Sequence, residues 1–219
     1  MDSFSFTVDE AHVKAYNEYF RDSRRLRVSA ALMTVLSLAA AVLVVLLWGA
    51  GLWTWIAAAL LVLFALACIY AFISVPKQIG TPQELYDRWP LVPAILAEVN
   101  PRDMTLLALV DRTATPEAGA GAGAGGTRPA LAVRTVTTIP GVPRKPGARV
   151  PSIAVSGRHT SGGELWDEVT PVPLAWGTPD KKVITRAEEA IPQEAWAKLR
   201  SLADRAPEVR VTRRGLLEL

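Results

Sequence analysis

Charged residues are missing from a long stretch near the beginning of the chain. None of the 49 residues between Arg27 and Lys77 carries a charge. A transmembrane helix needs about 20 apolar residues, so this stretch is too long for one span and fits two spans joined by a short turn. The two glycines in Trp48-Gly49-Ala50-Gly51-Leu52 mark that turn. The sequence therefore predicts a transmembrane hairpin over residues 28–76, with spans at 28–48 and 52–75.

A buried helical hairpin of a soluble protein and a cleaved signal peptide are the two alternatives. Helices this long that are apolar on every face exceed what the core of a small protein can cover. The arm before the first span has 27 residues with both acids and bases. No small-residue cleavage site stands out before the second span. We therefore expect the hairpin to be a permanent membrane anchor.

Cysteine and histidine are almost absent, which restricts the chemistry open to the chain. Cys68 is the only cysteine and lies in the second predicted span, so no disulfide can form within the chain. This fits a soluble part in the reducing cytoplasm. His12 and His159 belong to different segments, and without a second cysteine the usual zinc ligand sets cannot form. We expect neither a structural metal nor a cofactor.

The charges beside the hairpin predict its orientation. Lys77 follows the second span, and four arginines precede the first, at Arg21, Arg24, Arg25 and Arg27. Lysine and arginine near span ends favour the cytoplasmic side. We therefore expect a multi-pass protein of the inner (plasma) membrane with both termini in the cytoplasm. Trp48, Trp53 and Trp55 would then form an interfacial aromatic belt at the far side of the membrane.

Residues 1–27 are interpreted as an amphipathic N-terminal arm. Thr7-Val8-Asp9-Glu10 has the pattern of a capping box with Thr7 as the cap. Val13, Tyr16 and Phe20 follow at helical spacing, and the helix can continue into the first span. Its apolar stripe would either pack on the soluble domain or lie in the headgroup region. The sequence does not distinguish these two placements.

Residues 77–219 are predicted to form a cytoplasmic α+β domain. Thr81-Pro82-Gln83-Glu84 has the cap, proline and glutamate of a helix start. Segments bounded by turn residues predict strands at residues 94–99, 104–113, 130–139, 149–157 and 166–176. Pro171 and Pro173 would confine the last of these to a sheet edge or split it. Short strands of this kind predict a small antiparallel β-barrel or bent sheet, OB-like or SH3-like.

The C-terminal part of this domain is predicted to be mainly helical. Thr178-Pro179-Asp180 starts one helix, and Pro192 starts another that Pro207 should end. A strand-like segment from Val209 to Leu217 is the last predicted element. Between the predicted strands, the Gly/Ala-rich residues 116–129 are expected to form a flexible loop. They do not match a phosphate-binding loop, because no Lys-Ser or Lys-Thr follows the glycines.

We find no arrangement of residues that predicts catalysis. Ser156-Gly157 lacks the flanking glycine of a nucleophile elbow. The acid pairs Asp167-Glu168 and Glu188-Glu189 are adjacent in sequence, so their side chains diverge on a strand or a helix. They are interpreted as solvated charges. No catalytic residue is therefore proposed from the sequence.

Basic and aromatic residues of the domain are the candidates for contacts with lipids or a partner. Arg144, Lys145 and Arg149 lie in one turn-rich segment, which is either a solvated loop or a contact for anionic headgroups. Arg213-Arg214 is a weaker patch of the same kind. Trp166 and Trp176 fit core packing better than partner recognition. The domain has 19 basic and 16 acidic residues without a concentrated basic face, so we do not expect it to bind nucleic acid.

Three segments carry a family resemblance. They are residues 75–86, residues 97–104 and Pro173-Leu174-Ala175-Trp176-Gly177-Thr178-Pro179-Asp180. They resemble a family of uncharacterised bacterial membrane proteins with two spans and a domain of unknown function. The resemblance covers nearly all of the soluble part and implies no activity, cofactor or site residue. A looser likeness to short NfeD-type proteins, which join membrane spans to an OB-type barrel, rests on layout alone.

Two classes of function fit these observations. The favoured hypothesis is a non-enzymatic, membrane-anchored interaction protein, an accessory subunit or assembly factor of a larger membrane complex. Membrane lipids and a protein at the membrane or its cytoplasmic face would be its partners. The alternative is an enzyme or ligand-binding domain that acts on a membrane-linked substrate. A concave pocket lined by convergent polar side chains would favour the alternative.

Overall fold

The computed structural model describes residues 4–49, 51–113, 128–159 and 165–219. The chain forms two compact units. Residues Met1–Asn17 and Thr81–Leu219 make up the first unit, which we call the domain, and Glu18–Gly80 make up the second, which we call the hairpin. The domain therefore includes residues on both sides of the hairpin.

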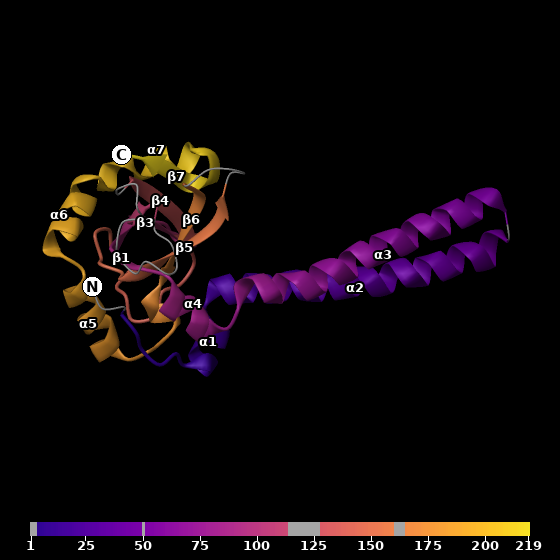
Figure 1. Ribbon diagram of the computed structural model, residues 1–219, viewed down its shortest axis with the longest axis horizontal. Coiled ribbons are helices and arrows are strands. Elements are labelled where there is room, and N and C mark those ends of the chain that lie inside the picture. Colours follow the sequence, from indigo (N-terminus) through magenta and orange to yellow (C-terminus); the bar gives the residue numbers. More distant parts are fainter. Residues whose placement is uncertain (1–3, 50, 114–127, 160–164) are drawn as a thin grey trace. The chain divides into compact units, whose positions relative to one another are not determined.

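The hairpin consists of two long helices, α2 (Glu18–Trp48) and α3 (Leu52–Ile79), joined by a short turn (Figure 1). Both predicted spans lie within these helices. Gly49 ends α2 with a φ of 71°, which a glycine adopts without the steric cost of a side chain. The apolar runs on both sides of this glycine are long enough for each helix to cross a membrane.

Small residues form the contact between the two helices. Ala30, Ser37 and Ala41 of α2 are buried, as are Ala58 and Ala65 of α3. They recur at spacings of four or seven residues, which places them on one face of each helix. Small side chains allow helix backbones to approach closely, as at helix contacts in membranes.

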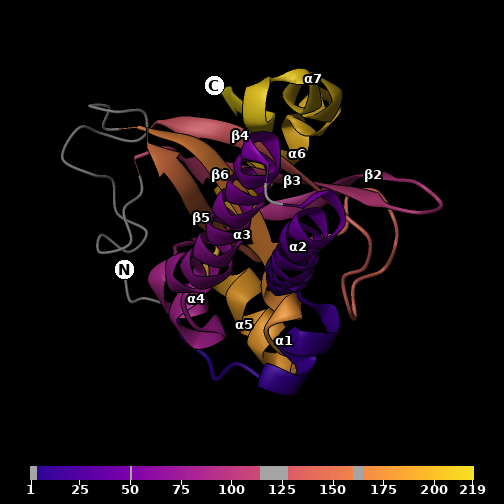
Figure 2. The ribbon, with the colours of Figure 1, turned by 90° about the vertical axis from the view of Figure 1, so that its right-hand side faces the viewer.

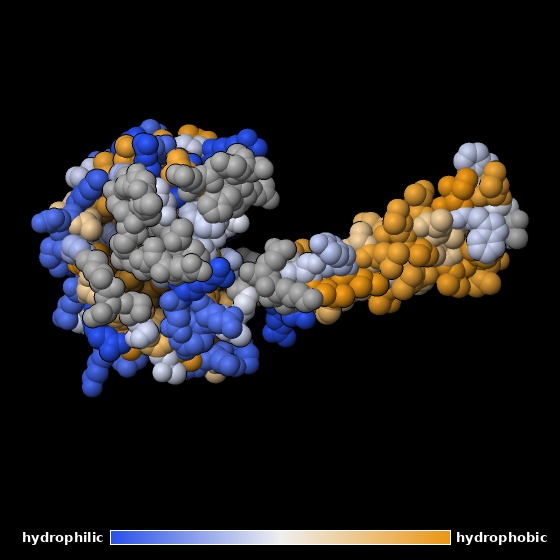
Figure 3. Space-filling model, viewed as in Figure 1, coloured by the Kyte–Doolittle hydropathy of each residue, from blue (hydrophilic) through white to orange (hydrophobic). Residues whose placement is uncertain are grey.

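The outward faces of the hairpin are large and apolar. Leu47 is 76% exposed, Leu63 is 64% exposed, and the face of the hairpin in view in Figure 3 is mostly hydrophobic. Only 17% of the most apolar window of α2 and 11% of that of α3 are buried. The core helices of a soluble protein are mostly buried, so the alternative of a soluble hairpin does not fit this surface.

The N-terminal arm differs from its prediction. Helix α1 (Glu10–Tyr16) is capped by Asp9, whose carboxylate accepts a hydrogen bond from the His12 amide, so the predicted cap at Thr7 is wrong. Asn17 then adopts an extended conformation with a ψ of 103°. Helices α1 and α2 are therefore separate, and the residues from Glu18 onward belong to the hairpin rather than to the arm.

The arm packs on the domain, which was one of its two predicted placements. Phe6 lies edge-on to the Tyr86 ring, with centroids 5.3 Å apart, and Val13 is 2% exposed. The Asp9 amide donates to the Gly177 carbonyl at 2.9 Å, and His12 Nε2 lies 2.9 Å from the Ala175 carbonyl oxygen.

Helix α4 (Pro82–Arg88) follows the hairpin and begins as predicted. Thr81 Oγ1 accepts a hydrogen bond from the Glu84 amide, and the Glu84 carboxylate accepts one from the Thr81 amide. Pro82 occupies the first turn, where its missing N–H has no helical partner to lose. The local sequence alone was sufficient to predict this helix.

The strands form two antiparallel sheets among the described residues, whereas the prediction was one small antiparallel barrel or bent sheet. The three-stranded sheet has the order β1-β5-β6 and the four-stranded sheet has the order β2-β3-β4-β7. Neither closes on itself, so the closed-barrel alternative and the likeness to OB-type barrels are wrong, while the antiparallel pairing of the strands is confirmed. The strands are β1 (Leu91–Val92), β2 (Ala94–Val99), β3 (Met104–Asp111), β4 (Pro129–Val136), β5 (Ser152–His159), β6 (Trp166–Pro173) and β7 (Leu216–Glu218).

The edge strand β6 explains part of this outcome. It pairs with β5 and contains Pro171 and Pro173. Proline has no N–H to donate to a further strand, so β6 cannot extend the three-stranded sheet here. The strand ends at Pro173, and the predicted continuation to Trp176 is instead the short 3₁₀ helix η1 (Leu174–Trp176). Most of the predicted Gly/Ala loop lies outside the described residues.

Helices after β6 complete the domain. They are α5 (Lys181–Ala190), α6 (Gln193–Ser201), η2 (Ala203–Arg205), α7 (Ala206–Val211) and η3 (Arg213–Gly215). Asp180, not Thr178, caps α5. Pro207 lies in the first turn of α7 instead of ending a helix, and Val209 is helical rather than in a strand. The strand-like ending is confirmed only for β7, which pairs with β4.

A hydrophobic core lies between the four-stranded sheet and helices α6 and α7 (Figure 2). Leu107 of β3 and Leu131 of β4 pack with Trp196 and Leu199 of α6 and with Val209 of α7, and all five are fully buried. Apolar residues at positions 196, 199 and 209 therefore cover the sheet, which is why this part of the chain is helical.

Candidate functional site

An open cleft lies where the two sheets meet, with a cavity volume of about 490 Å³. Arg112 follows β3, Asp167 belongs to β6, and the remaining lining residues come from η3 and β7. The lining residues are Arg112, Asp167, Arg213, Arg214, Leu216 and Glu218. Charged groups from four separate segments thus converge on one hollow.

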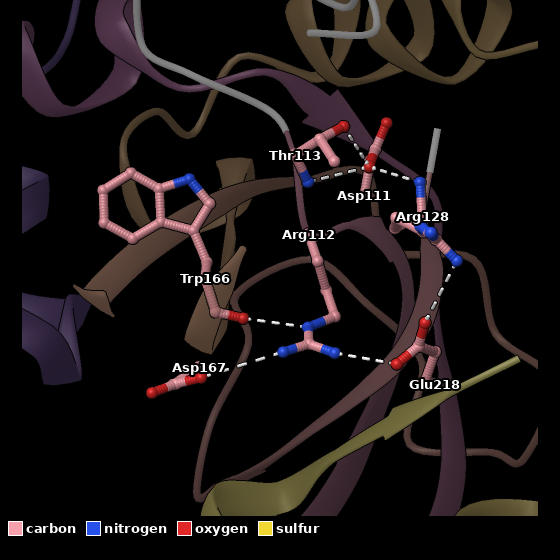
Figure 4. Close-up of polar contacts among 7 residues, drawn as sticks. All are labelled: Asp111, Arg112, Thr113, Arg128, Trp166, Asp167 and Glu218. Atoms are coloured by element: carbon pink, nitrogen blue, oxygen red, sulfur yellow. Dashed lines mark hydrogen bonds and ion pairs between the residues drawn. The ribbon is translucent and has the colours of Figure 1, made fainter. Parts of the chain in front are cut away.

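The Arg112 guanidinium, which lines this cleft, joins the two sheets (Figure 4). Its Nε donates to the Trp166 carbonyl at 2.9 Å, its Nη1 lies 2.9 Å from Glu218 Oε2, and its Nη2 lies 3.7 Å from Asp167 Oδ1. The Trp166 amide donates back to the Arg112 carbonyl at 2.9 Å. All three guanidinium nitrogens are engaged, and the side chain is only 16% exposed.

Arg214 reaches the same carboxylate group from η3. Its Nη1 lies 3.1 Å from Asp167 Oδ2. Arg214 has a φ of 67°, the one positive φ of a non-glycine residue among those described. Gly215 also has a positive φ, and a Cβ there would approach Val133 Cγ2 to 3.0 Å. Strained backbone of this kind persists where surrounding contacts hold it, and it is common at functional sites.

The ends of β3 and β4 are held together beside the cleft. Asp111 Oδ1 accepts hydrogen bonds from the Thr113 amide, the Thr113 hydroxyl and the Arg128 amide (Figure 4). The Arg128 side chain lies 3.9 Å from Glu218 Oε1. Three arginines therefore alternate with two carboxylates in the order Arg214, Asp167, Arg112, Glu218, Arg128.

The lining of the cleft retains an excess of positive charge. Three arginines and two acids line it, which leaves a formal charge of +1. Arg213 is exposed, and the structure gives its side chain no hydrogen bond or ion pair with a described residue. A guanidinium fork matches the geometry of carboxylate and phosphate oxygens. This arrangement is suited to binding an anionic group.

The predicted basic turn divides into residues of two kinds. Arg144 and Lys145 are exposed, and Arg144 Nη2 donates to the Asn100 carbonyl at 2.7 Å. Arg149 is half-buried, stacks over the Trp196 ring at 5.0 Å and donates to Gln193 Oε1 at 3.1 Å. Arg149 therefore supports the packing of α6, while the other two remain candidates for headgroup contact.

The two predicted tryptophans of the domain also differ. Trp176 is fully buried, donates through its indole N–H to the Thr138 carbonyl at 2.8 Å and lies under the Arg134 guanidinium. Core packing is confirmed for Trp176, which has no exposed surface to offer a partner. Trp166 is half-buried beside the cleft and packs edge-on against Trp89, with centroids 5.9 Å apart.

The three tryptophans of the predicted aromatic belt are exposed near the turn of the hairpin. Trp48 is 74% exposed, Trp53 is 79% exposed and Trp55 is 57% exposed. Their placement at a membrane interface stays a prediction. Among the residues that the structure describes, no group of three or more acidic, histidine or cysteine residues could hold a metal ion.

Sequence reasoning identified Arg213 and Arg214 but missed the rest of the cleft. Arg112, Asp167 and Glu218 are 51 or more positions apart in the chain, so no motif spacing connects them. Asp167 was interpreted as a solvated charge, whereas it pairs with two arginines. The available signal was weak, namely an arginine immediately after a long apolar strand.

The fold and its surfaces define an α+β domain joined to a hairpin of two helices long and apolar enough to span a membrane. The chain belongs to the family described as protein of unknown function (DUF3239), whose profile matches residues 77–207. This confirms the predicted resemblance to a family with a domain of unknown function. No curated protein matches the chain.

A solved structure extends this result. The chain is similar to a protein from Corynebacterium diphtheriae, solved as the "crystal structure of a putative membrane protein". The identity is 45%, the match covers 59% of this chain and 99% of that chain, and the TM-score is 0.53. Together with the two apolar helices, this similarity supports a membrane location for the protein.

Proposed function

We propose that the protein is a non-enzymatic interaction protein, an accessory subunit or assembly factor of a larger complex in the inner membrane. The observation that carries this proposal is the way in which the domain is built from both flanks of the hairpin. Asn17, the last domain residue before α2, is hydrogen-bonded to Tyr86 of α4, which follows α3. A domain with two covalent connections to membrane helices stays at the membrane surface, where its effective concentration towards a membrane partner is high.

The proposal includes an orientation. Arg24 and Arg25 are exposed on α2 just before its apolar surface begins at Leu26 and Val28. Arg27 is held over the Phe72 ring of α3 at 4.8 Å, at the same end of the hairpin. Arginines at this end favour the cytoplasmic side. The domain and both termini would then be cytoplasmic.

Purification from native membranes tests this function. The full-length chain is cross-linked in membranes, solubilised gently and purified through a tag, and each captured membrane protein is then tagged in turn. A stoichiometric complex that is recovered from both directions supports the proposal. A chain carrying the hairpin without the domain serves as the control, since a true partner of the domain is lost from it. Repeated recovery of a solitary monomer would overturn the proposal.

The cleft favours a second candidate function, a domain that binds a membrane-linked or soluble ligand. Its volume of about 490 Å³ falls within the range of small-molecule sites, and several polar side chains converge in it. This candidate does not exclude the first, because an accessory subunit can also bind a ligand. Ligand titration of the purified chain distinguishes the two candidates, because ligand binding can be measured without a protein partner.

A further inference from the structure

The donors that remain open in the cleft belong to two consecutive arginines. Arg112 uses Nε, Nη1 and Nη2 on Trp166, Glu218 and Asp167, so its role is to hold the cleft together. Arg214 gives one nitrogen to Asp167, and a guanidinium has five N–H donors. Arg213 has no partner among the described residues. Two guanidinium groups therefore present unused donors to the same hollow.

Both residues line the cleft, and the backbone turn that carries them is held in place on two sides. Arg214 adopts its left-handed conformation directly before Gly215, and the turn ends where Leu216 pairs with Ala132 of β4. Pairing of β7 on one side and the Asp167 contact on the other fix the turn. Ordinary turns place glycine or asparagine at such a position, and at Arg214 the contact with Asp167 holds the side chain at the cleft.

We propose that the cleft binds a phosphate group through Arg213 and Arg214. A phosphate monoester carries close to two negative charges and three acceptor oxygens, so it can accept from two guanidinium groups at once. A single carboxylate has two oxygens and satisfies one fork. The phosphate belongs either to a soluble compound or to a lipid headgroup, and the two sources share this chemistry. The inference rests on the second candidate function and does not require a protein partner.

Titration of the full-length chain in detergent with inorganic phosphate tests the first source. We expect saturable binding that Arg213→Gln weakens about tenfold or more, as expected for the loss of a charged hydrogen-bonding group. Arg200→Gln is the matched control, because Arg200 is exposed on α6 and does not line the cleft. Arg213 has no described partner to lose, so Arg213→Gln should keep the melting temperature of the wild type.

Native mass spectrometry of the same chains with phosphatidic acid tests the second source. Binding of phosphatidic acid that depends on Arg213 and is displaced only weakly by inorganic phosphate identifies a lipid headgroup. Binding of inorganic phosphate alone, again dependent on Arg213, identifies a soluble ligand. Arg214→Gly should weaken either form of binding while the domain stays folded, because glycine accepts the positive φ.

Two results would overturn the inference. One is the lack of saturable binding of either probe to the wild type. The other is an equal loss in Arg213→Gln and Arg200→Gln, which would show a nonspecific effect of net charge. Neither result bears on the accessory-subunit proposal, because recovery of a partner complex is measured without phosphate ligands.

Discussion

The side-chain amide of Asn17 donates a hydrogen bond to the Tyr86 hydroxyl at 3.2 Å, across 69 positions of sequence. The Tyr86 hydroxyl donates in turn to the Pro173 carbonyl at 3.1 Å. Asn17 and Tyr86 are both almost fully buried. This chain of bonds connects the segment before the hairpin, the helix after it and the end of β6. The domain therefore forms from the chain segments on both sides of the hairpin, and the hairpin is an insertion between these segments.

Replacement of Tyr86 by phenylalanine tests this connection. The change removes the buried hydroxyl to which the Pro173 carbonyl is hydrogen-bonded, and the loss of a buried hydrogen-bonding group costs about 1–3 kcal/mol. We expect a lower melting temperature of the full-length chain in detergent, followed by tryptophan fluorescence. Tyr70→Phe is the control, since Tyr70 is 73% exposed on the hairpin. Equal melting temperatures of the two variants would show that the bonds contribute little.

Tyr86 also predicts a pH dependence of stability. Burial raises the pKa of Tyr86 well above its usual value, and the nearby Arg134 charge offsets this only in part. Above pH of about 10 an unfolded tyrosine loses its proton while native Tyr86 keeps its own, so the native state binds more protons. The contribution of Tyr86 to the free energy of unfolding is therefore complete below a pH of about 10. Above this pH it falls by about 1.4 kcal/mol for each pH unit.

The measurement for this prediction is urea unfolding of the domain in the full-length chain at pH 9, 10 and 11. The wild type should lose more stability over this range than Tyr86→Phe, which has no phenol at this position to titrate. Groups that are exposed in both states cancel in the comparison. Parallel pH profiles of the two proteins would contradict the prediction.

Arg112→Gln should weaken the joint between the two sheets. The Trp166 carbonyl, Asp167 and Glu218 all lose a partner whose side chain is mostly buried, and we expect a loss of about 2 kcal/mol. Thermal unfolding measures the loss, with Arg200→Gln as the exposed control. A double-mutant cycle with Glu218→Gln isolates the coupling of that pair. A coupling energy near zero would show that the ion pair is too solvated to matter.

The proposed orientation predicts which cysteine probes react from outside intact cells. In a Cys68→Ala background, a probe at Gly51 should be labelled from outside, and probes at Ser5 and Leu219 should not be. Gly51 suits a probe because a Cβ there meets Thr54 Oγ1 at an ordinary 3.6 Å. Leu219 is chosen for the C-terminal probe because a substitution there leaves the ion pair of the neighbouring Glu218 intact. Labelling of Leu219 from outside would reverse the orientation.

Contact of the basic turn with lipid is tested with a fluorescent probe at Pro146 in nanodiscs. If the turn reaches anionic headgroups, each of Arg144 and Lys145 contributes about 1 kcal/mol. The probe should then report a less polar environment with anionic lipid, and salt should reverse the change. Arg144→Gln with Lys145→Gln should abolish it, and Arg149 is kept because it supports Trp196. An equal signal with neutral lipid would place the turn elsewhere.

The hairpin, helix α4 and strands β2 and β3 were predictable because their signals are local. An apolar run of 49 residues has few ways to fold, and a capping box specifies the first turn of a helix within four residues. The same holds for a strand bounded by turn residues, such as 94–99. These elements depend on neighbours in the chain, and the sequence contains those neighbours.

Only the tertiary structure decided whether the sheets close, how the C-terminal segment folds and which charges meet. Val209 is compatible with strand or helix, and it is helical because the four-stranded sheet offers an apolar face to α7. From the sequence, Asp167 was interpreted as a solvated charge. In the structure, the pairing of β6 with β5 and of β7 with β4 brings it between Arg112 and Arg214. The ion pairs of Arg112 and Arg214 join residues 47 to 106 positions apart, so they depend on strand order and register, which local patterns do not encode.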